Sequence, residues 1–279
     1  MSILDTVSFG YKYFQIFPLL REAIFINGIL TNSEIWYELK ESEIKELVDL
    51  DRLLIRRALQ CPVSTPLEAY HLELGLMNIG SLIKSRRVTY LHYILTSDKN
   101  SMLSKFFITQ DDNPCQGDWS EQARVDLADL QFPVDFPLIQ SKSAAVFKKM
   151  VKKKSKEYAL DELNQKKFEH SKMENLVYTE LKMQEYFKSN MTTKQKRNIF
   201  LYRTRMAEYS DNFRGTKEAL PCKMCGMHRD CQAHSQQCYE TMKNVKHIGK
   251  YEEIFTNKIS TETAEMLEDI KNAREDISE

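Results

Sequence analysis

Glycine and proline are scarce in this 279-residue sequence, which contains 8 glycines and 7 prolines. Folds with many short strands and tight turns need both residues, and glycine alone averages about 7% of protein sequence. Charged residues, in contrast, make up 29% of the chain. This composition argues against a strand-rich fold and favours long helices.

The sequence also lacks net charge and long apolar runs. Its 40 lysines and arginines balance its 40 aspartates and glutamates. Any attraction to nucleic acid or to a membrane surface must therefore come from local charge asymmetry. Because the apolar runs are short and interrupted by charges, we expect no transmembrane helix and no membrane partner.

Cysteines are few, and their distribution argues against a disulfide framework. Cys61 and Cys115 stand far apart, whereas the other four of the six lie within residues 221–238. No secretory signal precedes them. We therefore expect a reducing, intracellular compartment, either nuclear or cytoplasmic.

Helical periodicity recurs along the chain. Within residues 43–60, apolar side chains return every three or four positions on one face. Thr65, Pro66 and Glu68 form the pattern of a capping box that begins a short helix, and Gly75 is its expected stop. Further helices are expected over residues 12–31, 79–96, 101–110, 118–130, 143–168, 192–206 and 260–275.

Six potential zinc ligands crowd the segment PCKMCGMHRDCQAHSQQC, residues 221–238. Cys222 and Cys225 have the Cys-x2-Cys spacing of a knuckle turn, in which backbone amides donate hydrogen bonds to the thiolates. His234 and Cys238 are one helical turn apart, so both side chains can face one point. We therefore predict that these four side chains hold one zinc ion.

Two alternatives to this ligand set stay open. Cys231 and His234 are a competing second pair of ligands, because a spacing of three residues also places both side chains on one helical face. Alternatively, the cysteines are reduced and bind no metal, although such dense clustering has few other causes. His228 follows Cys225 too closely for the chain to fold back easily and place this side chain at the same metal ion. A zinc ion with four protein ligands has a closed coordination sphere, which indicates a structural rather than a hydrolytic site.

Single charges interrupt two of the apolar helix faces. Asp51 falls in the middle of the apolar stripe of residues 43–60, and Arg86 falls in the middle of that of residues 79–96. A buried charge is costly unless it is paired. We therefore predict a structural ion pair between Asp51 and Arg86, which would join two helices packed face to face. In the alternative interpretation, Arg86 contacts a phosphate backbone.

Basic segments supply the candidates for nucleic-acid contact. The lysine-rich run FKKMVKKKSKEY at residues 147–158 is typical of a solvated helix face. The run KQKRNIFLYRTR at residues 194–205 interleaves arginines with aromatic residues, which together can bind both phosphate and base. An ordinary core helix with a charged, solvent-exposed face has the same spacing. The predicted contacts are Arg57, Lys84, Arg87, Lys196, Arg197, Arg203 and Arg205.

Five segments follow one another along the chain in a specific order: LDTVSFGYKYFQIFPLLREAIFINGILTNSEIWYELKESEIKELVDLDRLLIRRAL, STPLEAYHLELG, SRRVTYLHYIL, YRTRMAEYSDNFRG and the Cys-Cys-His-Cys segment. In this order they resemble the C-terminal part of the reverse-transcriptase polyprotein of non-LTR retrotransposons. The resemblance covers nearly the whole chain, and its motifs are specific in combination. It implies that the opening helices act as the polymerase thumb, which grips the template duplex, and that the zinc-knuckle region is associated with nucleic-acid binding.

The resemblance also implies that the catalytic part is missing. In that family the palm carries a Tyr-x-Asp-Asp motif whose carboxylates hold two metal ions. The only Asp-Asp pair here is Asp111-Asp112, which we place in a loop and which has no preceding tyrosine and no flanking strand pattern. We therefore expect no enzyme activity, neither polymerase nor nuclease.

We predict an all-α fold, a helical bundle with a small zinc-knuckle unit near the C-terminus. The polar stretch at residues 109–119 is the best candidate for a domain boundary. The predicted divisions are a thumb-like helical region at 1–110, a basic helical region at 111–215, a Cys-Cys-His-Cys zinc knuckle at 216–250 and an acidic C-terminal helix at 251–279.

The predicted function is that of a nucleic-acid-binding remnant of a retrotransposon reverse transcriptase that lacks the palm. It would bind RNA or DNA in a sequence-tolerant way, through basic helices and a structural zinc knuckle. The remainder of a polymerase polyprotein is a further expected partner. The alternative is a non-catalytic protein-interaction module, or an inert helical module, that zinc stabilises. A salt-dependent affinity for nucleic acid separates the two.

Overall fold

The computed structural model describes residues 13–37, 39–113, 115, 117–169, 171–213 and 220–276. Within these ranges the chain forms helices and no β-strand, apart from two isolated β-bridges. The prediction of an all-α fold is therefore confirmed.

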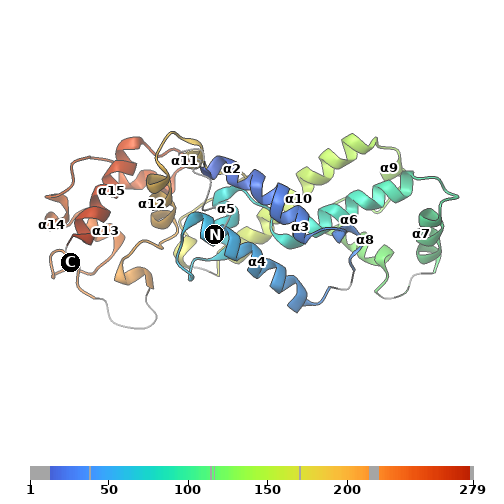
Figure 1. Ribbon diagram of the computed structural model, residues 1–279, viewed down its shortest axis with the longest axis horizontal. Helices are drawn as coiled ribbons and strands as arrows, with labels where there is room; N and C mark the ends of the chain where they lie inside the picture. Colours follow the sequence, from blue (N-terminus) through green and yellow to red (C-terminus); the bar gives the residue numbers. More distant parts are fainter. Residues whose placement is uncertain are drawn as a thin grey trace.

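The helices of the first half are α2 (Tyr13–Leu20), η2 (Arg21–Ile26), α3 (Asn27–Ile29), η3 (Ser33–Ile35), α4 (Glu41–Leu59), α5 (Leu67–Leu74), α6 (Ile79–Thr96), α7 (Met102–Asp112), α8 (Trp119–Asp129) and α9 (Phe136–Gln140). Those of the second half are α10 (Ala144–Lys167), η4 (Ser171–Met173), α11 (Glu185–Lys188), α12 (Thr193–Arg203), η5 (Ser210–Phe213), α13 (Gln232–Ser235), α14 (Tyr239–Met242), η6 (Tyr251–Phe255) and α15 (Thr261–Glu275). The molecule is elongated, with α7 at one end and α13 to α15 at the other (Figure 1).

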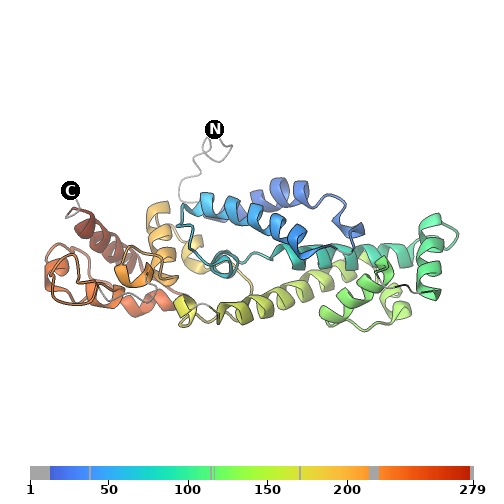
Figure 2. The same ribbon diagram turned by 90° about the horizontal axis from the view of Figure 1, so that it is seen from below.

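Helices α6 and α10 lie side by side and run antiparallel along one half of the molecule (Figure 2). Asn78, just before α6, donates a hydrogen bond to Glu162 near the end of α10 at 2.8 Å. At the opposite end, His92 Nε2 lies 2.9 Å from the carbonyl oxygen of Lys142, just before α10 begins. These two contacts fix the register of the pair.

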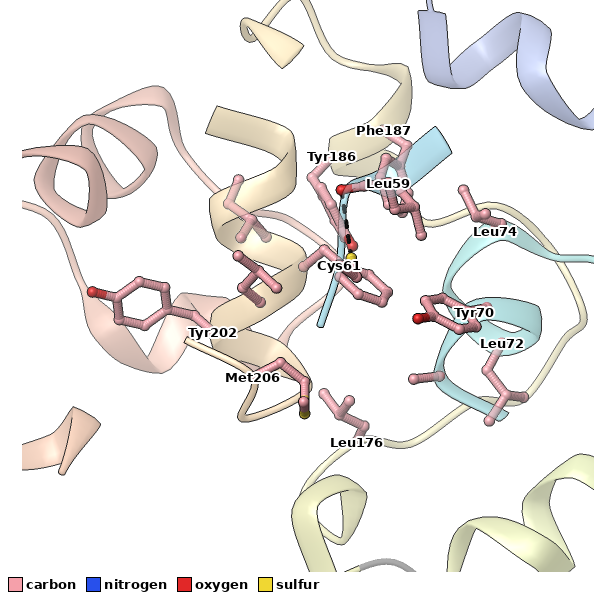
Figure 3. Packing of buried hydrophobic residues seen from close by; sticks show 14 of the residues in the cluster. Leu59, Cys61, Tyr70, Leu72, Leu74, Leu176, Tyr186, Phe187, Tyr202 and Met206 are labelled. Carbon is pink, nitrogen blue, oxygen red and sulfur yellow. Dashed lines mark hydrogen bonds between the residues drawn. The ribbon is translucent and has the colours of Figure 1, made fainter. Parts of the chain in front are cut away.

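Buried apolar side chains form three clusters along the long axis. The largest joins α2, α4, α5, α10, α11, α12 and α15, and Figure 3 shows Tyr70, Phe187 and Met206 within it. The second lies among α6 to α10, and the third lies where η2 and α3 meet α6. The largest cluster draws side chains from three of the four predicted divisions, and the division itself stays a prediction.

The short helix α5 begins differently from the prediction and ends as predicted. Its N-cap is Pro66 with no side-chain cap, and the Thr65 hydroxyl donates to the Pro62 carbonyl at 2.8 Å. The predicted capping box is therefore wrong. Gly75 ends the helix with a φ of +67°, and a Cβ there would lie 2.3 Å from the backbone of Lys182. Only glycine satisfies both this conformation and this close approach.

Pro18 lies inside α2, near its end, and a π-helical segment follows this helix. Proline lacks an amide hydrogen and displaces a preceding carbonyl, and π-turns occur where the regular hydrogen-bond ladder is disturbed. The π-helical segment η2 begins at Arg21, which is buried. The helical period thus changes at Arg21, a charged residue whose side chain lies on the inner face of the helix.

Asp51 is buried, with 1% of its surface exposed, and its partner is Arg21. The Arg21 Nε and Nη2 atoms donate to the two carboxylate oxygens at 2.7 and 2.6 Å. His71 Nε2 lies 3.3 Å from the second oxygen. Burial raises the pKa of Asp51, but the hydrogen bonds from Arg21 and His71 outweigh it and lower the pKa to about 2. The carboxylate is therefore ionised at ordinary pH.

The predicted Asp51–Arg86 ion pair is wrong. Arg86 donates instead to the Asn27 side-chain oxygen at 2.7 Å and to the carbonyl of Leu30, which ends α3. A helical wheel identifies the face that a charge occupies, but not which other helices pack on that face. The segment from α2 to α3 packs near both α4 and α6, and supplies a partner for each charge.

Replacing Asp51 with Ala should lower the free energy of unfolding by about 3–5 kcal/mol, because the Arg21 guanidinium would remain buried without its carboxylate. Asp49→Ala, at an exposed position of the same helix, is the matched control and should change it by less than about 0.5 kcal/mol. Urea denaturation followed by circular dichroism measures both. Equal losses in the two variants would contradict the buried pair.

Candidate metal centre and basic surfaces

A tight turn opens the Cys/His unit, which we define as residues 220–242. The Cys222 amide donates to the His228 carbonyl at 2.6 Å, and the Gly226 amide donates to the Cys222 carbonyl at 2.8 Å. Gly226 has a φ of +69°, a conformation that other residues adopt only with strain. The glycine after the second cysteine thus allows the sharp bend that the spacing predicted.

The second pair of ligands comes from two short helices that follow each other closely. His234 lies in α13, and Cys238 directly precedes α14. The Cys238 amide donates to the His234 carbonyl at 2.8 Å, which keeps the two residues one turn apart. Cys231 has a different role, because it is the N-cap of α13 and its sulfur accepts a hydrogen bond from the His234 amide at 3.4 Å.

The structure brings Cys222, Cys225, His234 and Cys238 together. Their ligand atoms all lie within 4.8 Å of one another, and the Cys225 sulfur is 3.4 Å from His234 Nε2. Bonds of about 2.0–2.3 Å in a tetrahedral site place ligand atoms roughly 3.3–3.8 Å apart, so only a small contraction separates the cluster from that geometry. The four side chains could hold a metal ion, and Cys231 is outside the group.

Backbone amides in the turn favour the thiolate form of the cysteines. The amides of His228 and Met227 donate to the Cys225 sulfur and, together with His234, lower the pKa of Cys225 to about 6. Burial raises the pKa of Cys222, although amides within its own turn oppose this effect. Thiols must lose their protons to bind a metal. Cys225 is therefore prepared for metal binding near neutral pH.

Buried polar contacts fix the Cys/His unit to the helical body. Asp230 accepts hydrogen bonds from Arg274 of α15 at 2.8 Å and from the Ser210 amide at 2.9 Å. Gln232 donates to the carbonyl of Tyr202, in α12, at 3.0 Å. The unit is thus packed on the last two long helices rather than attached through its ends alone.

Three of the seven residues predicted to contact nucleic acid are buried. Arg87 donates to Asp126 at 2.6 Å, and Arg203 donates to Glu73 at 2.8 Å. Their side chains are 5% and 2% exposed, and Lys196 is 0% exposed. These three residues cannot reach a ligand in the folded protein, so this part of the prediction is wrong. Their positions on the inner faces of α6 and α12 account for their burial.

The other four predicted residues keep some access to solvent. Arg57 is exposed, and Lys84 is partly buried beside two aspartates of α8. Arg197 is partly buried and donates to the Gln60 carbonyl at 2.7 Å. Arg205 pairs with Glu174 at 3.3 Å on the surface. Contact of these four side chains with nucleic acid stays a prediction.

Glu73, the fully buried carboxylate that binds Arg203, is not among the residues predicted from the sequence. Tyr178 and Tyr186 also donate hydrogen bonds to it, the latter at 2.8 Å. Burial raises the pKa of both tyrosines well above the usual value, so they remain donors. No residue of α5 from Glu68 to Leu74 faces solvent. In a helix that is buried on every side, the sequence has no separate polar and apolar faces. A helical wheel therefore cannot identify Glu73 as a charge that points into the core.

A groove of about 530 Å³ lies between α6 and α10. The rings of Tyr90 and Tyr93 stack at its edge, with centroids 5.8 Å apart and an interplanar angle of 18°, and Tyr93 is 59% exposed. Its walls combine cations, aromatic rings and two acids, namely Arg86, Lys148, Lys152, Tyr90, Tyr93, Glu22 and Glu34. Lys148 and Lys152 are exposed and one helical turn apart on α10.

Replacing Arg203 with Ala should lower the free energy of unfolding by about 3–5 kcal/mol, because Glu73 would be left buried without its cation. Arg205→Ala, two residues further on, removes only a surface pair and should cost about 1 kcal/mol or less. Thermal or urea denaturation of the two variants measures the difference. Unchanged stability in the Arg203 variant, combined with weaker nucleic-acid binding, would contradict the buried assignment.

Among the described residues, no helix has the length and apolar character that crossing a membrane requires. The same residues contain no second group of His, Cys, Asp or Glu side chains that could hold a metal ion. Comparisons of the chain with protein-family models, with curated proteins and with solved structures found no match. The candidate site therefore has to be interpreted from its own residues.

Proposed function

We propose that the Cys/His unit binds one zinc ion and that this ion is structural. Three thiols and one imidazole are a common zinc donor set, and four protein ligands leave no position open for a substrate. The docking of the unit on α12 and α15 supports a stabilising role, because an ion that orders the unit would also order its contacts with these helices.

Zinc content tests the ligand set. The purified chain should carry one zinc ion, and Cys238→Ser should reduce the content well below one per chain because it removes a ligand. Cys231→Ser is the matched control and should retain zinc, since a serine can still cap α13. Elemental analysis after gel filtration measures the content. Retention in the Cys238 variant with loss in the Cys231 variant would reverse the assignment.

We further propose that the chain is a non-catalytic, nucleic-acid-binding remnant of a non-LTR retrotransposon reverse transcriptase. The ordered resemblance along the sequence supports the origin. The observation that carries the binding function is the groove between α6 and α10, which is lined both by Lys148 and Lys152 and by the stacked pair Tyr90 and Tyr93. Cations that neutralise phosphates and aromatic rings that stack with bases are the two components of sequence-tolerant single-strand binding.

The arrangement of the only Asp-Asp pair supports the absence of polymerase chemistry. Asp111 and Asp112 end helix α7 rather than lying in the loop that we predicted, and Asp111 accepts a hydrogen bond from Arg124. A metal-dependent palm needs carboxylates that converge on two ions. Among the described residues, the only group of three or more His, Cys, Asp or Glu side chains that could hold a metal ion is the Cys/His cluster.

A protein-interaction module is the second candidate, and one surface feature favours it. An apolar hollow near α7 is lined by Ile35, Tyr37 and Phe106, among other residues. These three side chains are all exposed. Contiguous exposed apolar surface is typical of sites that bind other proteins. The burial of three predicted contact cations also weakens the nucleic-acid proposal relative to this alternative.

Nucleic-acid binding should depend on salt and on the groove. We expect the chain to bind a single-stranded 20-nucleotide RNA or DNA, with an affinity that falls as salt rises. The double variant Lys148→Gln/Lys152→Gln should bind more weakly and reduce the magnitude of the salt slope by roughly 1–1.5, since each lost phosphate contact contributes about 0.7. Tyr93→Ala should lose about 1–3 kcal/mol of binding free energy through lost stacking.

The control for this experiment is the double variant Lys45→Gln/Lys258→Gln, which removes the same charge at two exposed positions outside the groove. Fluorescence anisotropy at several salt concentrations compares the variants. Equal weakening in both double variants would indicate diffuse attraction and exclude the groove. No affinity at low salt would reject the nucleic-acid proposal and favour the interaction module.

A further inference from the structure

A second cavity, of about 100 Å³, lies where α12 and α15 meet the Cys/His unit. Four basic side chains line it, from all three parts of the structure: Arg197, Lys223, Lys271 and Arg274. Two acids, Glu208 and Glu275, are also at its wall. The cavity has room for several water molecules, which is enough for one small oxyanion.

The charges around this cavity are only partly compensated. Lys271 pairs with Glu275 at 3.4 Å, and Arg274 pairs with Asp230 at 2.8 Å. Arg197 donates to a backbone carbonyl, which carries no net charge. Within the described residues, neither Arg197 nor Lys223 belongs to a salt bridge, so the cavity has a local excess of positive charge.

Two hydrogen-bond donors on α12 lack acceptors beside this cavity. Asn198 is 1% exposed, and its side-chain nitrogen is buried without a hydrogen-bond partner. The Nε atom of the neighbouring Arg197 is also buried without a partner. A buried donor without an acceptor costs about 1–3 kcal/mol, and such groups are rare in folded proteins. An anion in the cavity would accept these hydrogen bonds and offset the cost.

We propose that this cavity binds a phosphate group. A phosphate has several acceptor oxygens, and guanidinium, ammonium and amide donors that approach from different helices can reach different oxygens at once. The small volume suits one phosphate group rather than a whole nucleotide. The proposal does not rest on nucleic-acid binding by the groove, since a free phosphate and a backbone phosphate present the same chemistry.

A bound phosphate would link three parts of the molecule. Arg197 and Asn198 come from α12, Lys271 comes from α15, and Lys223 lies in the turn between Cys222 and Cys225. A ligand that binds only the folded state stabilises it. Phosphate should therefore raise the unfolding temperature of the chain, by an amount that grows with the logarithm of its concentration above Kd.

Thermal unfolding with increasing inorganic phosphate, at constant ionic strength maintained with chloride, tests the proposal on the full chain. We expect the wild type to be stabilised increasingly, as the logarithm of the phosphate concentration once this exceeds Kd. Asn198→Leu and Arg197→Gln should each raise the apparent Kd at least tenfold. Asn198→Leu is informative because removal of an unsatisfied buried amide should leave the unliganded protein as stable as the wild type or more so. Lys194→Gln, on the same helix but outside the cavity lining, is the control and should respond like the wild type.

The absence of stabilisation by phosphate at constant ionic strength, or a response that persists unchanged in both the Asn198 and Arg197 variants, would overturn the proposal. Competition identifies the source of the phosphate. If inorganic phosphate displaces a single-stranded oligonucleotide from the wild type but not from the Arg197 variant, the site takes a backbone phosphate. If phosphate stabilises the chain without affecting oligonucleotide binding, the site takes a free phosphate. The Lys148/Lys152 double variant should keep its phosphate response, so a failure of the groove and a failure of this site are distinguishable.

Discussion

The buried ion pair between Glu73 and Arg203 joins parts of the fold that are 130 residues apart in sequence. Glu73 comes from α5, and the two tyrosines that also bind it come from the segment around α11. Arg203, at the end of α12, also donates to the carbonyls of Ile254 and Thr256. One carboxylate and one guanidinium thus fix the N-terminal half, the middle and the C-terminal segment around the largest apolar cluster. Loss of either charge would leave the other without its counter-ion in that cluster.

The candidate metal centre depends on the same arrangement. Tyr202, next to Arg203, supplies the carbonyl that accepts a hydrogen bond from Gln232, and its hydroxyl lies 2.9 Å from that of Tyr209, which donates to Ser235. The Cys/His unit therefore packs against a surface that α12 and α15 form together. Metal binding and the stability of this end of the molecule should be coupled, because the contacts that position the ligands are also tertiary contacts.

Local features of the structure could be predicted from the sequence, whereas the partners of buried charges could not. The ligand set of Cys222, Cys225, His234 and Cys238 follows from spacing within 17 residues, and α6 and α15 follow from helical period. Charged residues are rarely fully buried, so Lys196 and Arg203 were expected at the surface. Glu73 lies 130 residues away from Arg203. Only the assembled fold shows that such groups meet. For the same reason, the sequence could not show that Asp51 pairs with Arg21 rather than with Arg86.

Because Lys196 and Arg203 are buried, their charges cannot contribute to the binding of a polyanion at the surface. With no net charge, the molecule has no long-range attraction for a polyanion, and binding must arise where cations are exposed and close together. Among the described residues, several cations line each of two hollows: the groove between α6 and α10, and the cavity beside the Cys/His unit. Helices α6 and α10, which line the groove, and helices α12 and α15, which line the cavity, lie in different parts of an elongated molecule (Figure 1). A single flexible strand that engaged both would have to run along the long axis, and the linked sites would reinforce each other only if the strand could span the distance between them.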